Sequence, residues 1–553
     1  MKRVYFVFFI FFLMSISCKK FLDLKPLDSL SPVNYYETED QLNAALAGVY
    51  DIMGQNNLYR TYFLSRMGLD ADESYYARST QTGNVSVYDV PSSDPLVAGT
   101  WQELYIGINR ANMLLANINK PVMDSANRNH IKGQALFLRA YYYFLLVSNW
   151  GPVPLLLKPI ASASQFNIPR TPAKDVYGTI IEDMTEAEQL VQTAKEVGFG
   201  GRVSKSAVRG LLARVCLHMA GHPVMDVSKY ADARMWAKKV MDPDQDGFQH
   251  VLNPSYSDEF IKMCQDQYNI ASSIWEVEFY GNGSTVTPGF NETGGVGSYD
   301  GIAYSGTDPS IGYAYGFAGA IPRLFKLYVS KTRDSVTPTG SIVKVEYSPD
   351  TRRDWAISPY YISGTPAVKH YWPSTSIYQR VCGKWRREYE EVLPKGKSAG
   401  PTNFPLLRYS DVLLMFAEAD NAINGPTMAG IDAVNQVRRR AYGNNTKADL
   451  LPGQYTDKAT FLQTIQDERE RELCFESLRK GDLVRWGILI PRMKLIASDY
   501  INGDPSVGIP LPPAPYAYGI HAFNDVSARD TLWPISPREL GLNPGHRIPG
   551  GDS

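Results

Sequence analysis

The sequence predicts a mainly α-helical protein in which helices pair with one another and a long loop-rich segment interrupts them. Apolar residues recur at helical spacing through the first 245 residues, and the same pattern returns after residue 405. Between these regions, residues 281–319 hold eleven glycines in 39 positions and no Lys or Arg. Glycine at this density cannot sustain a helix. The glycine-rich segment is thus expected to be a loop excursion. The helices on either side of it, paired antiparallel through short connections, indicate an α-solenoid-like body.

The first half of the chain contains several helix signals in succession. A capping box at residues 38–41 opens a helix, followed by helices at about 101–118 and 125–150. The helix at 125–150 has apolar residues on two faces, which predicts burial on more than one side. Further helices open at Thr171-Pro172 and at Ser204. No repeat of about 34 residues can be read along the chain.

The second half predicts helices at about 408–424, 429–441 and 458–479. A dense charge run at 467–472 lies in the last of these, and we expect it to form ion pairs that tie helices together. We expect an N-terminal helical half at 18–245, a loop-rich region at 246–405 and a C-terminal helical part at 406–553, joined as one compact unit.

Composition excludes several classes of protein. The 553 residues include 56 Lys and Arg against 57 Asp and Glu, whereas a nucleic-acid-binding protein leaves a basic footprint. The five cysteines form no CxxC pair, and we expect four of them to be small buried side chains. Tyrosine (35) outnumbers phenylalanine (22), which suits wet binding surfaces as well as cores.

The first 18 residues resemble a bacterial export signal that ends in a lipidation site. Lys2 and Arg3 precede an apolar run at 4–16, too short to span a bilayer but suited to a signal peptide. Small residues before Cys18 look like a lipobox, with Ser15 where leucine is usual. Cleavage of residues 1–17 would leave an acylated Cys18 as a membrane anchor. The alternative is an ordinary cleaved signal with an incidental cysteine.

Motifs for catalysis and metal binding are missing or broken. No HExxH occurs, no GxSxG nucleophile elbow is expected, and a helix break separates His218 from His222. Residues 396–398 resemble the end of a P-loop, but Glu391 occupies the position of its first glycine. We therefore predict no enzyme, cofactor or metal. The carboxylate pair of a glycosidase comes from distant segments, so that alternative stays open.

An ordered set of motifs along nearly the whole chain resembles the SusD/RagB-like nutrient-binding lipoproteins of the Bacteroidota outer membrane. Gln134 stands where that family often has Glu. The matching segments are CKKFLDLKP (18–26), GQALFLRAYYYF (133–144), WGPVP (150–154), GRVSKSA (201–207), LRYSDVLLMFAEA (407–419), the residues from Glu468 to Gly487, LWPI (532–535) and NPG (543–545).

This resemblance implies both a fold and a role. The fold would be a SusD-like superhelix of TPR-like helix pairs that cradles a loop-rich, ligand-facing region. The protein would be anchored in the outer membrane through Cys18 and face the exterior, as a lid over a SusC-like TonB-dependent transporter. It would capture oligosaccharides, or peptides in some members, and pass them inward without catalysis. Ligand contacts vary between members, so the resemblance assigns none.

The residues themselves nominate the ligand contacts. Aromatic rings match the apolar faces of sugars, while Asp, Asn and Arg match their hydroxyl groups. Two loops offer this chemistry, and the absence of Lys and Arg from residues 281–319 disfavours phosphorylated or sulfated ligands there. The alternative is that these tyrosines pack the loops onto the helices. The candidates are Asp72, Tyr75, Tyr76 and Arg78 in the first loop, Tyr299, Tyr304, Tyr313 and Tyr315 in the second, and Trp372 apart from both.

We therefore predict a surface lipoprotein that binds oligosaccharides or polysaccharides and delivers them to a transporter. Three alternatives remain: the same architecture binding peptides, a surface glycan hydrolase, and a structural lid with no ligand affinity of its own.

Overall fold

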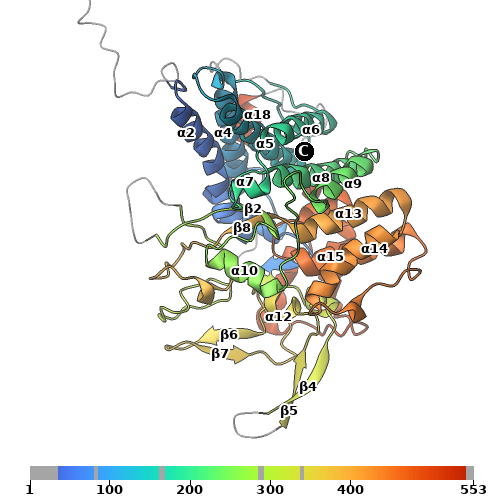
Figure 1. Ribbon diagram of the computed structural model, residues 1–553. Coiled ribbons are helices and arrows are strands. Elements are labelled where there is room, and N and C mark those ends of the chain that lie inside the picture. Colours follow the sequence, from blue (N-terminus) through green and yellow to red (C-terminus); the bar gives the residue numbers. More distant parts are fainter. Residues whose placement is uncertain (1–34, 80–84, 161–167, 284–291, 337–341, 544–553) are drawn as a thin grey trace, which may run out of the picture.

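The structure, a computed structural model, describes residues 35–79, 85–160, 168–283, 292–336 and 342–543 (Figure 1). The predicted signal peptide and Cys18 lie outside these residues. The described part is mainly helical, which confirms the predicted fold class. No helix within it has the length and apolar character needed to cross a membrane.

The N-terminal half stacks its helices in chain order. Helix α4 packs on α5, α5 on α6, and α8 on α9, as expected for helix pairs. The bounds are α2 Glu39–Tyr50, α3 Tyr62–Ser65, α4 Pro95–Asn117, α5 Ser125–Trp150, α6 Ala173–Leu190, α7 Ala194–Val197, α8 Lys205–Ala220 and α9 Lys229–Met241.

Local capping explains where these helices begin. The Asp124 side chain accepts hydrogen bonds from the N–H groups of Ala126 and Asn127, so α5 begins as predicted. Helix α4 begins six residues before the predicted start, because Asp94 caps it and Pro95 occupies its first position. At α2, Thr38 caps the helix, but Gln41 accepts from the Glu37 N–H rather than completing the predicted box.

The middle of the chain contains short elements joined by loops. These are α10 Tyr256–Cys264, α11 Pro322–Leu327, α12 Arg353–Ala356, β2 Ser273–Val277, β3 Ala318–Ala320, β4 Lys331–Val336, β5 Ile342–Tyr347, β6 Tyr360–Ser363, β7 Val368–Tyr371 and β8 Phe404–Arg408. Together with β1 (Ser74–Tyr76), the strands pair as antiparallel two-stranded sheets: β1–β3, β2–β8, β4–β5 and β6–β7. Figure 1 shows the last two hairpins at the end of the molecule opposite α2, α4 and α6.

The C-terminal part returns to helices: α13 Tyr409–Asn424, α14 Met428–Ala441, α15 Lys458–Leu473, α16 Arg479–Arg485, α17 Leu489–Asn502 and α18 Pro537–Leu542. The prediction of one helix over 458–479 is wrong. The backbone at Phe475 and Ser477 is left-handed (φ 65° and 57°), which ends α15 and separates it from α16.

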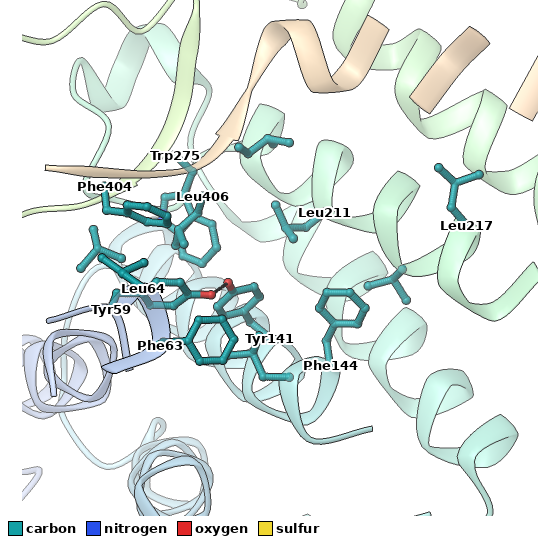
Figure 2. Close-up of a cluster of buried hydrophobic side chains, with 14 of the residues drawn as sticks. Tyr59, Phe63, Leu64, Tyr141, Phe144, Leu211, Leu217, Trp275, Phe404 and Leu406 are labelled. Atoms are coloured by element: carbon teal, nitrogen blue, oxygen red, sulfur yellow. Dashed lines mark hydrogen bonds between the residues drawn. The ribbon is translucent and has the colours of Figure 1, made fainter. Parts of the chain in front are cut away.

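The apolar core joins both helical halves. The Tyr141 ring of α5 meets the Trp275 ring of β2 edge-on, and Figure 2 shows both near Tyr59 and Phe404 of β8. The hydroxyl groups of Tyr59 and Tyr141 form a hydrogen bond within this cluster. Cys216, Cys264, Cys382 and Cys474 are buried and reduced, as predicted for small core side chains. Strands β2 and β8 therefore connect the loop-rich region to the helical body through aromatic packing.

A network of buried charges lies beside this core and confirms the expectation for the charge run at 467–472. Glu468, Glu470 and Glu472 of α15 are all buried and pair with arginines from other elements. Glu472 bonds to both Arg352 and Arg408, which lie far apart in the sequence. These ion pairs hold the C-terminal helices against the middle segment.

Candidate functional site

Strand pairing brings the two predicted ligand loops together. Strand β1 pairs with β3 so that Tyr76 lies opposite Ala318. The Ala77 N–H then donates a hydrogen bond to the Phe317 carbonyl oxygen at 2.8 Å. Residues 76–78 therefore lie beside residues 315–318, although neither loop shows this in its own sequence.

Five aromatic rings form a continuous cluster at this junction, which we name the tyrosine surface: Tyr76, Tyr299, Tyr313, Tyr315 and Phe317. Tyr315 stacks on Tyr299 (ring centroids 5.1 Å apart) and on Phe317 (4.9 Å). Tyr313 meets the Tyr315 ring edge-on at 4.9 Å, and Tyr76 lies 5.0 Å from Phe317. Tyr76 and Phe317 are buried, whereas Tyr299, Tyr313 and Tyr315 are partly exposed. The buried rings support three rings that solvent can reach.

Positive charges surround these rings from outside the cation-free segment. The Arg78 guanidinium lies 4.7 Å from the Phe317 ring centroid, and Arg66 lies 4.3 Å from that of Tyr76. The Lys397 ammonium lies 4.7 Å from the Tyr313 ring. The expectation that phosphorylated or sulfated ligands are disfavoured rested on residues 281–319 alone, and other parts of the chain place cations beside the rings of this segment. Anionic groups on a ligand are compatible with such a setting.

Backbone hydrogen bonds fix the segment that presents the rings. The Tyr315 N–H donates to the Ser298 carbonyl at 2.7 Å, and the Phe317 N–H donates to that of Tyr299 at 2.8 Å. Between them Gly316 has a φ of +67°, and a Cβ there would lie 2.6 Å from the Ala303 Cβ. Only glycine fits this position without strain. The exposed tyrosines are thus held in place before any ligand arrives.

A buried carboxyl group lies under the same loop. Asp300 accepts a hydrogen bond from the Gly297 N–H at 2.7 Å. Burial raises the pKa of Asp300 to about 7, and this hydrogen bond opposes the rise. Asp300 is closed off from solvent, so its role is to shape the turn before Tyr299.

Two sequence-predicted candidates of the first loop, Asp72 and Tyr75, lie in the interior. Asp72 is buried between Arg479 (2.7 Å) and Arg492 (2.6 Å). Burial alone would raise the pKa of Asp72, but the two guanidinium groups outweigh it and lower the pKa to about 2. Tyr75 is buried against the Tyr500 and Tyr518 rings. We leave these residues out of the proposed site because a ligand cannot reach them.

Tyr304 and Trp372 lie apart from the tyrosine surface. Tyr304 is buried and donates a hydrogen bond to the Gly364 carbonyl at 2.9 Å, in the turn between β6 and β7. Trp372 follows β7, with its ring 4.5 Å from that of Tyr361. The structure therefore brings together Tyr76, Arg78, Tyr299, Tyr313 and Tyr315, and separates the other four candidates from them.

Sequence reasoning did not nominate Phe317, Arg66, Lys397 or Ser398. Phe317 continues the alternation of Tyr313 and Tyr315, and this period of two was a usable signal for one face of an extended segment. The Ser398 hydroxyl lies 3.2 Å from that of Tyr315. Nothing local in the sequence connects Arg66, Lys397 or Ser398 to the tyrosines, because only the tertiary fold brings them close.

The described residues contain no group of three His, Cys, Asp or Glu side chains arranged to hold a metal ion. The tyrosine surface offers ring faces, hydroxyl groups and cationic donors.

Two family models match the chain over most of its length. Residues 20–217 match a family described as starch-binding and associating with the outer membrane, and residues 358–546 match the SusD family. The chain belongs to the SusD/RagB-like family. The resemblance inferred from the motifs is thereby confirmed.

Relatives of this SusD-like chain align along nearly all of it. The SusD-like protein P25 of Formosa agariphila is 26% identical, over 88% of this chain and 90% of the relative. A SusD homologue of known structure from Bacteroides thetaiotaomicron is 25% identical, with a TM-score of 0.78 over 93% of this chain and 97% of that one. This agreement supports the TPR-like helical fold.

Two further structures share the fold at lower identity. A laminarin-binding SusD-like protein is 20% identical, with a TM-score of 0.69 over 94% of this chain and all of that chain. The surface glycan-binding protein A of Bacteroides thetaiotaomicron, solved with laminarihexaose, is 18% identical, with a TM-score of 0.67 over 92% of this chain and 99% of that one.

Proposed function

We propose that this SusD-like protein binds glycan chains on the tyrosine surface without cleaving them. The observation that supports this is the row of three partly exposed rings, in which Tyr315 stacks on Tyr299 and meets Tyr313 edge-on. Sugar rings present apolar C–H faces that such aromatic rings can cover. The likeness to laminarin-binding and laminarihexaose-bound structures supports the same ligand class.

Polar groups at the edge of the rings suit the rest of a sugar. The tyrosine hydroxyls and Ser398 can donate to or accept from sugar hydroxyl groups, and Arg78 and Lys397 supply cationic donors. Because the backbone already holds the rings in place, little conformational entropy is lost on binding. The surface thus combines stacking with directional hydrogen bonds.

Replacing Tyr315 by alanine tests this function most directly, because its ring contacts three others of the cluster. We expect affinity for the bound glycan to fall at least about tenfold, as for a central contact of an interface. Laminarin and starch are the first glycans to test, by affinity electrophoresis and calorimetry. Tyr268→Ala is the control, since Tyr268 is 41% exposed and its ring contacts Phe199 instead.

Other outcomes would favour the other functions. Binding of peptides but of no glycan would change the ligand class. Release of new reducing ends from laminarin by the purified protein would favour a hydrolase. A wild-type protein that binds neither, yet is needed for uptake, would favour a purely structural lid.

We also propose that Cys18 is acylated and anchors the protein in the outer membrane, facing the exterior beside a SusC-like TonB-dependent transporter. The family description, which associates this fold with the outer membrane, supports the location. Purification of the lipidated protein from membranes should bring a large barrel protein with it. Recovery without such a partner would argue against delivery to a transporter.

Replacing Cys18 by alanine should move the protein from the membrane fraction to the soluble fraction, because the acylated residue is lost. Fractionation followed by immunoblotting measures this shift. Cys216→Ala is the control, since Cys216 is buried within α8. A Cys18→Ala protein that stays in the membrane fraction would contradict the anchor.

A further inference from the structure

In the β6–β7 hairpin, strand β6 has one face packed and one face open, whereas all four residues of β7 are exposed. Along β6, Tyr360 and Ile362 are buried, while Tyr361 and Ser363 are exposed. The buried pair packs with Ile302 and Tyr304 as a small apolar cluster. Because side chains alternate along a strand, Tyr361 and its cross-strand neighbours point away from this cluster.

The open face is aromatic, although solvent-facing sides of antiparallel sheets are usually polar. Tyr361 lies opposite His370, and their rings stack at 4.9 Å with an interplanar angle of 21°. The Trp372 ring lies 4.5 Å from the Tyr361 ring, with an interplanar angle of 39°. Tyr361 is 39% exposed and Val368, on the same face, is 50% exposed. We name Tyr361, His370 and Trp372 the hairpin stack.

The hairpin stack is held firmly in place. The Trp372 N–H donates to the Pro359 carbonyl at 2.9 Å, and the Ala367 N–H donates to Asp308 at 2.8 Å. With the Tyr304 hydrogen bond to Gly364, these contacts fix both ends of the ribbon. Rings fixed in this way lose little entropy when they bind a partner.

The segment that carries the tyrosine surface is tied to this hairpin. Tyr304 and Ala314 exchange two backbone hydrogen bonds of 2.9 Å, and Ala314 lies between Tyr313 and Tyr315. The same Tyr304 packs under the hairpin through its side chain. A single bridged loop therefore supports both aromatic surfaces.

We infer that the hairpin stack is a second contact surface for the glycan. While one part of a long glycan chain lies on the tyrosine surface, the hairpin stack binds a further part of the same chain. This inference rests on the proposed function. Three side chains present far less surface than the roughly 800 Å² per partner that a standard protein interface buries. Their size instead suits contact with a few sugar rings. A polymer that spans both surfaces gains affinity because its second contact is intramolecular.

The test compares a polymer with a short oligosaccharide. The variants are the double substitution Tyr361→Ala with Trp372→Ala, the single Trp372→Ala, Tyr315→Ala, and Tyr268→Ala as the control. We expect the double variant to bind laminarin about tenfold more weakly, and laminarihexaose as tightly as wild type. Tyr315→Ala should weaken binding of both ligands. If the protein binds starch rather than laminarin, starch is the polymer and a maltose-type oligosaccharide is the short ligand in the same comparison.

The outcomes separate this inference from the proposed function. If the double and single hairpin variants bind the polymer like wild type while Tyr315→Ala loses it, the second surface is refuted and the first stands. If wild type binds no glycan, the proposed function fails and the inference fails with it. If the hairpin variants keep full polymer affinity but no longer co-purify with a barrel protein, the stack is a protein contact and the inference is overturned.

Discussion

Replacing Glu472 by alanine is expected to lower the free energy of unfolding by about 3–5 kcal/mol, the cost of breaking a buried ion pair. Glu472 is 0% exposed and accepts hydrogen bonds from Arg352 (3.2 Å), Arg408 (2.9 Å) and Arg440 (2.5 Å). Burial alone would raise the pKa of Glu472, but the three guanidinium groups outweigh it and hold the pKa well below its ordinary value. The carboxylate therefore stays ionised in the folded protein.

The three arginines do not depend equally on Glu472. Arg408 keeps Glu476, and Arg352 keeps Asp350 and Glu468. Arg440 is buried and forms its ion pair with Glu472. Removing Glu472 leaves the Arg440 charge uncompensated in the interior, which is the main source of the expected loss.

Urea unfolding monitored by circular dichroism measures this loss, with an exposed ion pair as the matched control. Lys132 and Glu186 form a 2.5 Å pair at the surface, with side chains 38% and 50% exposed. Glu186→Ala should cost less than about 1 kcal/mol because water and salt screen such pairs. If Glu472→Ala unfolds the protein outright, Glu472→Gln, which keeps one acceptor oxygen, should give an intermediate loss. Equal small losses at Glu472 and Glu186 would contradict the argument.

Replacing Glu73 by glutamine is expected to stabilise the protein at pH 8 and to change little near pH 5. Glu73 is buried and accepts a hydrogen bond from the Phe475 N–H at 2.8 Å. Burial raises the pKa of Glu73 to about 8, and the charges of Asp72 and Glu470 add to the rise. The side chain is therefore mostly protonated in the folded protein at neutral pH.

The sign of the effect follows from proton binding. Between the unfolded pKa of about 4.5 and the folded pKa of about 8, the folded state binds a proton at Glu73 that the unfolded state has lost. The contribution of Glu73 to the free energy of unfolding is thus fully present below pH 4.5 and falls as the pH rises to 8. Glutamine does not titrate and still offers an oxygen to Phe475, so it avoids roughly 4 kcal/mol of this loss at pH 8.

Thermal unfolding at several pH values between 5 and 8 measures the difference between Glu73→Gln and wild type. Because other buried carboxyls titrate in both proteins, only this difference reports on Glu73. Glu186→Gln is the matched control, because it makes the same change of carboxyl to amide at a half-exposed side chain. A difference that stays constant with pH, or that favours wild type at pH 8, would contradict the prediction.

Much of the helical body could be predicted from the sequence, because capping residues and apolar spacing are local signals. Asp124 and Gly151 bound α5 within the predicted range, and Ser204 caps α8 as expected. The break between α15 and α16 was missed. Its cause is the left-handed backbone at Phe475 and Ser477, which surrounds the buried Glu476 and its long-range partners Lys384 and Arg408.

The candidate site could be predicted only in part. The sequence showed that residues 72–78 and 299–315 hold aromatic and polar side chains, but not which of them solvent reaches. Tyr76 belongs to the tyrosine surface and Arg78 borders it, whereas Asp72 and Tyr75 of the same loop lie in ion pairs and apolar packing. Strand alternation turns neighbouring residues to opposite sides, and the partner strand that decides the direction comes from the far end of the loop-rich segment.

By itself the sequence determined the helical scaffold and the family, because caps, apolar periodicity and ordered motifs act between residues close in the chain. The tertiary structure alone decided that Tyr299, Tyr313 and Tyr315 form one surface, that Arg66 and Lys397 stand beside it, and that the hairpin stack is a separate surface. The physical reason is that the exposure of a side chain depends on what packs over it, and here that comes from segments far away in the sequence.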